Sequence, residues 1–342
     1  MKKYKTVIIG GGPAGLRCAQ ILAENKEDHI LLEAKSGIYR KICTGMYGVV
    51  GSELNGRNYF PLPEEIFQKK FNKVILHLKN RKKEVADVQP FVATLDRRKL
   101  NQWMYDEAVK SGANMAFNST VTEIGENYVS TDGEKMFFDY LVGADGSNSV
   151  VRRKLGLSMV GMLAIQYWVE RDWPNMEIFL DYFKYGPWYA WLAPHGGKFS
   201  IGTGADTDTI KAEKIKSNLD NLCDKLKIPR DKNDLEGAFI NHSYEGYKFG
   251  NIFLAGDAAG LSSGLTGEGI YFALVSGEDV AKMIIDSSYN PVSINKILKK
   301  RKRHEFFVKI LKNKILGPLA LRLAFALLSF NAFKVKAIRF IS

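Results

Sequence analysis

Glycine residues near the N-terminus have the spacing that binds the phosphates of a dinucleotide. Gly10, Gly12 and Gly15 follow the apolar run 6–9 in the order Gly-x-Gly-x-x-Gly. Gly10 permits a tight turn, Gly12 lets backbone N–H groups approach a pyrophosphate, and Gly15 lets the next helix pack closely on the strand. The N-terminus of that helix would offer free N–H groups and the positive end of its dipole to the phosphates.

An acidic residue at the end of the next apolar run supports a dinucleotide site. The run 29–32 is followed by Glu33, 18 residues after Gly15. A carboxylate at this place suits the diol of a ribose and would repel a 2′-phosphate. These residues alone leave open whether the ligand is NAD or FAD.

Two later glycine and aspartate motifs favour FAD. Asp145 and Gly146 follow the apolar run 138–144, and Gly256 and Asp257 follow a second buried run. The small residues after Asp257 would let a cofactor chain lie against the backbone. Asp257 itself is placed to hydrogen-bond a ribityl hydroxyl.

The elements that must position these residues alternate between strand and helix. Residues 6–9 and 29–33 are predicted strands, and 16–23 is the helix between them. A further helix is expected over 97–111. A long helix over 269–287 would direct its N-terminus at the partly negative N1/O2 edge of a reduced flavin.

These motifs together resemble the para-hydroxybenzoate-hydroxylase-type FAD superfamily, and further stretches are similar to the geranylgeranyl reductase family. Residues 189–196, Tyr-Ala-Trp-Leu-Ala-Pro-His-Gly, are similar to the family's Tyr-x-Trp-x-Phe-Pro-Lys-Gly. Residues 265–270 resemble its Leu-Thr-Gly-Glu-Gly-Ile closely. Residues 41–45 are similar to its Lys-x-Cys-Gly-Gly, and Asp96-Arg97 to its Asp-Arg helix start. The resemblance covers about residues 5–290.

The chain departs from the family pattern at four positions. Ala193 replaces a Phe, His195 a Lys, Thr44 a Gly, and Asn101 an acid. Ala193 and Thr44 would alter the shape of the pocket, so the substrate can differ from the family's usual one. His195 could meet an anionic headgroup or occupy an ordinary loop position.

The resemblance implies an enzyme that adds a hydride from N5 of reduced FAD to an isolated C=C bond of a prenyl (geranylgeranyl-type) lipid, while an acid protonates the other carbon. The implied catalytic residues are Cys43, Tyr189 and Trp191. The implied FAD-binding residues are Gly10, Gly12, Pro13, Ala14, Gly15, Glu33, Ala34, Lys41, Cys43, Arg97, Val121, Asp145, Gly146, Gly256, Asp257, Gly267, Gly269 and Ile270. No His, Cys, Asp and Glu cluster has metal-ligand spacing, so no metal is expected.

Aromatic residues between 165 and 200 are candidate walls of an apolar tunnel that holds the alkene over the flavin. Any one of them could instead be an ordinary aromatic of a sheet core, just as Cys43 could be a small buried hydrophobe. The candidates are Tyr167, Trp168, Trp173, Phe179, Tyr182, Phe183, Tyr185, Trp188, Tyr189 and Trp191.

Two other functions remain open on the same fold. One is an FAD-dependent monooxygenase, halogenase or epoxidase, and the other is an electron-transfer or lipid-binding flavoprotein. Trp191 and Pro194 only half match the halogenase Trp-x-Trp-x-Ile-Pro, because Tyr189 replaces the first Trp. The electron donor, NAD(P)H or a ferredoxin-type carrier, is not decided by the sequence.

The net charge of +12 is carried by one end of the chain. Residues 290–342 hold 13 Lys and Arg and one acid, Glu305, whereas the remainder is neutral. The apolar run 315–330, interrupted by Pro318 and Arg322, is shorter than the roughly 20 residues of a membrane span. An interfacial helix on an anionic membrane is therefore favoured over a helix pair packed on the body. No nucleic-acid-binding module accompanies the charge, so no nucleic acid partner is expected.

The length of 342 residues suggests about two domains. The sequence predicts an α/β protein with a Rossmann-type FAD-binding domain (GR2-like) from 1–60, 90–158 and 245–290. An antiparallel-sheet substrate domain is expected from 61–89 and 159–244, and cationic, apolar helices from 291–342. Three Cys are too few for a disulfide scaffold, and the N-terminus is no signal peptide, which favours a cytoplasmic, peripheral membrane protein. We expect a monomer.

Overall fold

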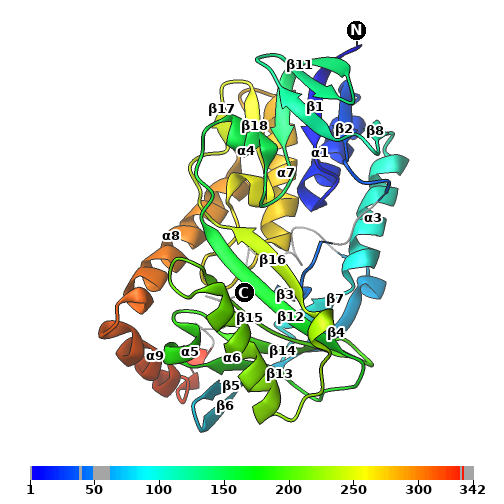
Figure 1. The fold of residues 1–342 in the computed structure, drawn as a ribbon. Helices are drawn as coiled ribbons and strands as arrows, with labels where there is room; N and C mark the ends of the chain where they lie inside the picture. The colour runs from blue at the N-terminus through cyan, green and yellow to red at the C-terminus, as the bar shows by residue number, and fades with distance from the viewer. Residues whose placement is uncertain (1, 38–40, 49–61, 332, 335–342) are drawn as a thin grey trace.

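A computed structural model describes residues 2–37, 41–48, 62–331 and 333–334. Parts of the predicted segments 1–60, 61–89 and 291–342 therefore lie outside the described residues. The glycine turns lie in a unit built on an eight-stranded sheet, and a second unit is built on a seven-stranded sheet (Figure 1). The predicted α/β class, with its Rossmann-type domain and C-terminal helices, is confirmed.

The eight-stranded sheet is mostly parallel at its centre. Its main path runs β17-β18-β11-β1-β2-β8, and the strands from β18 to β8 pair in parallel. Strands β10 and β9 extend it through antiparallel pairs. The bounds are β1 Lys2–Ile9, β2 His29–Leu32, β8 Met115–Ala116, β9 Val121–Ile124, β10 Tyr128–Thr131, β11 Glu134–Gly143, β17 Lys248–Phe249 and β18 Ile252–Leu254.

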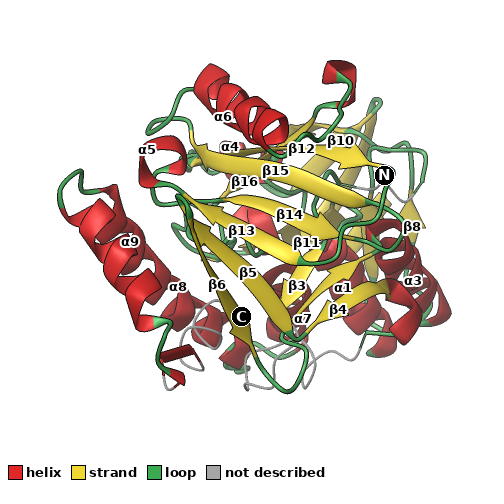
Figure 2. Ribbon diagram, turned by 90° about the horizontal axis from the view of Figure 1, so that it is seen from below, coloured by secondary structure: helices red, strands yellow, loops and turns green. Residues whose placement is uncertain are grey.

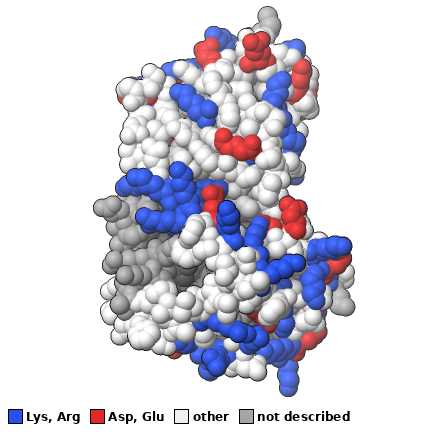
Figure 3. Space-filling view, turned by 90° about the vertical axis from the view of Figure 1, so that its left-hand side faces the viewer, with Lys and Arg blue, Asp and Glu red and all other residues white. Residues whose placement is uncertain are grey.

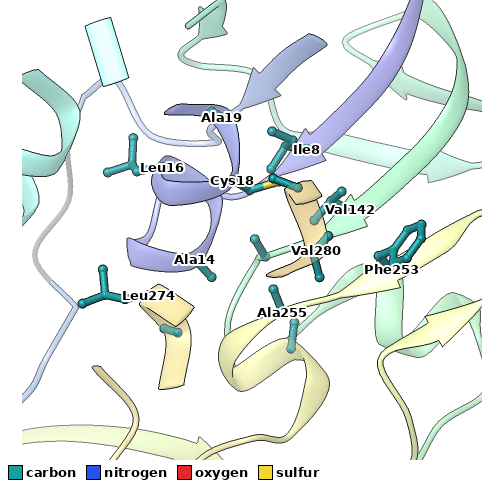
Figure 4. Close-up of a cluster of buried hydrophobic side chains, with 14 of the residues drawn as sticks. Ile8, Ala14, Leu16, Cys18, Ala19, Val142, Phe253, Ala255, Leu274 and Val280 are labelled. Atoms are coloured by element: carbon teal, nitrogen blue, oxygen red, sulfur yellow. The ribbon is translucent and has the colours of Figure 1, made fainter. Parts of the chain in front are cut away.

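Helices cover this sheet and bury its apolar residues. Helix α1 (Pro13–Glu24) packs against α7 (Ile270–Ile285) and α3 (Arg97–Lys110), and α4 (Val150–Lys154) follows β11. Figure 4 shows the core between sheet and helices, where Ile8 and Val142 of the strands lie near Cys18 of α1 and Val280 of α7. Parallel strands buried in this way require continuous apolar runs, which is why β1 and β2 were recognisable in the sequence.

The seven-stranded sheet has the order β16-β12-β15-β14-β13-β5-β6 (Figure 2). Its pairs are antiparallel except for the parallel pair of β13 with β5. Helix α6 (Ala212–Lys225) packs on β12 and β15, and the short helix α5 (Tyr182–Tyr185) follows β13. The bounds are β5 Lys73–Leu78, β6 Arg81–Ala86, β12 Gly161–Val169, β13 Met176–Leu180, β14 Ala190–Pro194, β15 Phe199–Asp206 and β16 Glu236–Asn241.

A small antiparallel sheet of three strands completes the strand pairing. It consists of β3 (Met46–Gly48), β7 (Val92–Leu95) and β4 (Phe67–Phe71). The predicted segment 61–89 is thus shared between two sheets, because β4 pairs here whereas β5 and β6 join the seven-stranded sheet. Three short 3₁₀ turns, Glu64–Ile66, Lys232–Asp234 and Gly256–Ala259, lie in connections. The predicted domain bounds remain a prediction.

The C-terminal helices α8 (Val292–Lys312) and α9 (Leu316–Leu327) pack on the body of the molecule. Asp279 of α7 accepts a hydrogen bond from the N–H of Ile294, in the first turn of α8, at 2.8 Å. At the other end of α8, Lys312 forms an ion pair with Asp206 of β15 at 2.6 Å. Both ends of α8 are therefore fixed, one to each of the two larger units.

Candidate active site

A cavity of about 1070 Å³ extends from the glycine turns to the seven-stranded sheet. Most ligand pockets have volumes of roughly 300–1,000 Å³, so this one has room for a large ligand. All the residues predicted to bind FAD or to act in catalysis line it, with the exception of Gly15.

The turn between β1 and α1 is shaped by close backbone approaches. Gly10 has φ +105°, and a Cβ there would lie 2.5 Å from the carbonyl oxygen of Ala144. A Cβ on Gly15 would lie 1.9 Å from the carbonyl oxygen of Gly10, so Gly15 packs α1 onto the turn instead of facing the cavity. A Cβ on Gly12 would meet nothing within 4 Å, and no side chain caps α1. The first N–H groups of α1 are thus available to a pyrophosphate.

Glu33 is held at the end of β2 by backbone donors. Its Oε2 accepts a hydrogen bond from the N–H of Gly11 at 2.7 Å, and its Oε1 accepts one from Lys35 at 2.9 Å. Ala34 and Val121 line the cavity with it. A fixed carboxylate beside the phosphate turn has the position expected for a ribose contact.

Asp257 lies in a polar cluster and lines the same cavity as the phosphate turn. Its carboxylate pairs with Lys41 and accepts hydrogen bonds from the hydroxyls of Ser147, at 2.9 Å, and Ser262. Burial alone would raise the pKa of Asp257, but Lys41 and the two hydroxyls together hold this pKa below its usual range. Asp257 is therefore an anion that can accept hydrogen bonds from ligand hydroxyls.

Some buried polar atoms of the cavity residues have no hydrogen-bond partner in the protein, and these atoms show whether the cavity fits FAD. Arg97 is only 6% exposed, and the Nε and Nη1 of its guanidinium have no hydrogen-bond partner among the described residues. Asp145 accepts a hydrogen bond from Val150 at 2.6 Å through Oδ2, while its buried Oδ1 has none, and burial raises its pKa. Such atoms cost free energy unless a ligand pairs with them. Together with the phosphate turn, Glu33 and Asp257, they fit a dinucleotide with polar groups at both ends.

Cys43 lies in a loop that contacts the seven-stranded sheet through its neighbour Thr44. It lines the cavity, and its Sγ accepts a hydrogen bond from the N–H of Gly45 at 3.3 Å. The hydroxyl of Thr44 donates to Gln166 of β12 at 2.9 Å, and Gln166 donates to Glu236 of β16 at 2.9 Å. Thr44, which stands where the resembling family has Gly, therefore ties the Cys43 loop to the second sheet.

Tyr189 and Trp191 of β14 also line the cavity. The Tyr189 hydroxyl donates to the carbonyl oxygen of Thr266 at 2.6 Å, and burial, reinforced by the Glu268 carboxylate, raises its pKa. The Trp191 ring lies over Gly202, where a Cβ would come within 2.3 Å of it. Its buried Nε1 has no hydrogen-bond partner in the described part of the chain. The indole of Trp191 can occupy this position because Gly202 has no side chain.

An ion pair that sequence reasoning missed lies in the same wall. Glu268, between the two predicted glycines of its loop, lines the cavity and pairs with Lys300 of α8 at 2.8 Å. Burial raises the pKa of Glu268. Arg301 is buried as well, pairing with Glu305 and donating to the carbonyl oxygen of His242 at 2.8 Å. Two of the cations counted in the segment 290–342 are therefore internal. The Glu within the Leu-Thr-Gly-Glu-Gly-Ile segment was the signal available for this pair.

Only three of the ten candidate aromatic residues line the cavity: Trp188, Tyr189 and Trp191. Side chains alternate along a strand, so Tyr167 of β12 points to the opposite face and donates to Asp220 of α6 at 3.1 Å. Phe183 is 70% exposed. His195, considered for a headgroup, does not line the cavity, being buried with its ring 4.8 Å edge-on from that of Trp168.

Aliphatic side chains, not aromatic ones, form most of the far end of the cavity. We call this part the aliphatic end. It is lined by Val74 and Leu76 of β5, by Met176, Ile178 and Leu180 of β13, and by Leu321, Ala324, Phe325 and Leu328 of α9 and the turn after it. Strands β5 and β13 are parallel neighbours, with Val74 opposite Met176. Sequence reasoning missed this set because its members come from three distant segments.

Nothing among the described residues resembles a metal site, since no group of three or more His, Cys, Asp and Glu side chains could hold an ion. Within the same residues, every helix is too short or too polar to cross a membrane.

Comparison with known proteins gives the family. Residues 57–179 match a family model described as an FAD binding domain. The chain is 31% identical over 319 residues to an uncharacterized protein of Methanosarcina barkeri, covering 89% of this chain and 80% of the relative. It is 26% identical over 351 residues to digeranylgeranylglycerophospholipid reductase 1 of Methanosphaera stadtmanae, covering 90% and 80%.

Solved structures share the fold. A geranylgeranyl bacteriochlorophyll reductase-like protein from Thermoplasma acidophilum has a TM-score of 0.75 at 19% identity over the whole of both chains. A p-nitrophenol 4-monooxygenase from Pseudomonas putida has a TM-score of 0.73 at 16% identity, covering 99% of this chain and 97% of that one. The fold is thus common to several kinds of flavoenzyme. The named sequence relative and the sequence motifs point more specifically, to geranylgeranyl reductases. The chain belongs to the geranylgeranyl reductase family of FAD-dependent oxidoreductases.

Proposed function

We propose that the protein reduces C=C bonds in the prenyl chain of an isoprenoid lipid. The observation that carries this proposal is the aliphatic end, which belongs to the same cavity as Cys43 and packs against Trp191. An extended hydrocarbon would be held there without unpaired polar groups. The named reductase among the relatives supports the same substrate class.

Reduced FAD, when bound, supplies a hydride to an alkene carbon. The residues of this chain would position the alkene and keep it away from water. Trp191 and the β13 side chains would hold it, and the apolar side chains of the aliphatic end would exclude water. The acids that line the cavity include the thiol of Cys43 and the carboxyl of Glu268. We assign protonation of the second carbon to the Cys43 Sγ, because the Glu268 carboxylate already pairs with Lys300. Electrons would reach the flavin from NAD(P)H or from a ferredoxin-type carrier.

An anaerobic experiment separates this reaction from its alternatives. The flavoprotein is reduced with dithionite and mixed with a geranylgeranyl lipid, while the oxidised-flavin absorbance and the product mass are followed. Reoxidation without air, with a gain of two hydrogens per double bond, is the expected result. A flavin that stays reduced until air is admitted, followed by oxygen in the product, would establish a monooxygenase, the alternative that the shared fold supports. If no product forms, either without air or after air is admitted, a carrier or lipid-binding role would be favoured.

A further inference from the structure

Helix α9 presents apolar side chains on two opposite faces. Its inner face carries Leu321, Ala324 and Phe325, which line the aliphatic end. Its outer face carries Leu316, Leu319 and Leu323, followed by Phe330, at spacings of three, four and seven residues. These four outer side chains are between 53% and 64% exposed. A helix with apolar side chains on an exposed face as well as on its buried face is unusual at a water-exposed surface and indicates a further apolar partner.

The surroundings of this outer face add apolar and cationic groups. Ile315, in the turn between α8 and α9, is 76% exposed, and Phe183 of α5 lies nearby, since its neighbour Tyr182 donates to the carbonyl oxygen of Asn313 at 3.1 Å. The Nζ of Lys79 lies 5.7 Å from the centre of the Phe183 ring. Lys314, in the turn between α8 and α9, and Arg322 of α9 are exposed.

Charge on this side of the molecule has one predominant sign. No Asp or Glu occurs in the chain after Glu305. Figure 3 shows this side, with Lys and Arg side chains gathered in a band across its middle. On α8 itself, Lys302, Arg303 and Lys309 are exposed. An apolar stripe beside cations is complementary to an anionic lipid surface, which offers hydrocarbon beneath negative headgroups.

We propose that the outer face of α9 docks on an anionic lipid bilayer, with the helix lying in the plane of the interface. The 12 residues of α9 are too few to span a bilayer but enough to lie in its surface. Charge complementarity, and the apolar residues that α9 carries on both its outer face and its cavity face, favour a bilayer over a protein partner. The occupant is therefore a membrane whose surface carries anionic phospholipid.

Docking in this way has a consequence that rests on the proposed function. Helix α9 forms a wall one helix thick, with the bilayer on one side and the aliphatic end on the other. A prenyl chain would pass from the bilayer to the cavity along this helix, while its headgroup stays at the interface. The substrate would thus be taken from the membrane without crossing water.

Vesicle sedimentation of the full-length, FAD-loaded protein tests the docking. Vesicles of equal parts phosphatidylcholine and phosphatidylglycerol are compared with vesicles of phosphatidylcholine alone. We expect sedimentation with the anionic vesicles, a loss of at least tenfold in the partition coefficient for L319E/L323E, and a smaller loss with weaker salt dependence for R322E. The matched control is V109E, at an exposed position of α3, on the opposite side of the molecule from α9 in Figure 1.

The outcomes that overturn the docking are distinct from those that overturn the reductase. If the parent stays in solution with anionic vesicles, or if L319E/L323E binds them as the parent does, the bilayer is not the partner. If sedimentation velocity shows a dimer that only L319E/L323E dissolves, the outer face is an interface between two copies, which also overturns the proposal. Turnover of a short detergent-soluble prenyl alcohol should be unchanged in L319E/L323E. Docking without any alkene reduction would leave the membrane proposal standing and overturn the function.

Discussion

The ion pair between Glu268 and Lys300 connects the cavity wall to the C-terminal helix through two buried side chains. Removing one partner of a buried pair leaves the other charge uncompensated and typically costs about 3–5 kcal/mol, whereas replacing both is often nearly neutral. We expect E268Q and K300M each to lower the free energy of unfolding by about 3 kcal/mol. The double variant should recover most of this loss.

Urea denaturation of the two single variants and the double variant measures the coupling energy directly. Single variants within about 0.5 kcal/mol of the parent would mean that the pair is fully hydrated, in conflict with its burial. Because the raised pKa of Glu268 arises chiefly from burial, K300M should raise that pKa further.

Asp257 makes a second prediction, concerning the cofactor. D257N removes the negative charge that Lys41 and two serine hydroxyls stabilise. Hydrogen bonds to a charged group contribute about 1.5–3 kcal/mol, so we expect FAD to bind roughly tenfold to a hundredfold more weakly. Titration of apoprotein with FAD, followed by flavin fluorescence, measures the change. The exposed D208N serves as control, and equal affinities in D257N and the parent would contradict the assignment.

Residues within one turn or motif were predictable, whereas residues joined only by the tertiary fold were not. Gly10, Gly12 and Glu33 act through local backbone geometry, which their spacing reveals. Lys300 was counted only among the cations of residues 290–342, since nothing in the neighbouring sequence indicates a partner 32 residues earlier. The predicted roles of Cys43, Tyr189 and Trp191 remain predictions, although all three face one cavity.

At the scale of elements, the contact that fixes the end of α8 to β15 predicts an effect of pH. Burial alone would raise the pKa of Asp206, but hydrogen bonds and charge from His242 and Lys312 hold it below its usual range. A lowered folded-state pKa stabilises the protein above the unfolded value of about 3.9, and this contribution is lost as the pH falls through the folded-state pKa.

Replacing that carboxylate should remove this dependence. D206N is expected to lower the free energy of unfolding at neutral pH by about 2 kcal/mol. Its difference from the parent should shrink as the pH falls below the unfolded value. Urea denaturation at several pH values is the measurement, and a constant difference at all pH values would show that Asp206 acts by shape alone.

Elements were predictable where periodicity is strong and local. The strand at 6–9, the helix at 97–111 and the helix at 269–287 are confirmed within a few residues by β1, α3 and α7. The parallel pairing of β5 with β13 was not predictable, because the two strands are about a hundred residues apart and each reads as an ordinary half-buried strand. The pairing of β4 with β7 was not predictable either, because each of these strands also reads as an ordinary half-buried strand.

For the molecule as a whole, the C-terminal segment is part of the enzyme body. A chain ending at Pro291 would lose Lys300, Arg301 and the α9 wall of the cavity. We expect this truncation to lower the thermal midpoint by about 5 °C or more and to expose apolar surface that binds a hydrophobic dye. Calorimetry and dye fluorescence measure both effects. An unchanged midpoint would mean that the helices are merely attached. Because truncation also perturbs the fold, point variants of the outer face test membrane docking more cleanly.

The distribution of cations also affects how the protein would approach a membrane. The remainder of the chain is neutral, so the net charge of +12 is concentrated in residues 290–342. A negative surface would attract this segment more strongly than the rest of the molecule, so the protein would be rotated into its docking orientation before any contact forms. This pre-orientation acts over the Debye length, about 8 Å at physiological ionic strength. Added salt should therefore slow capture by anionic vesicles much more than it speeds release.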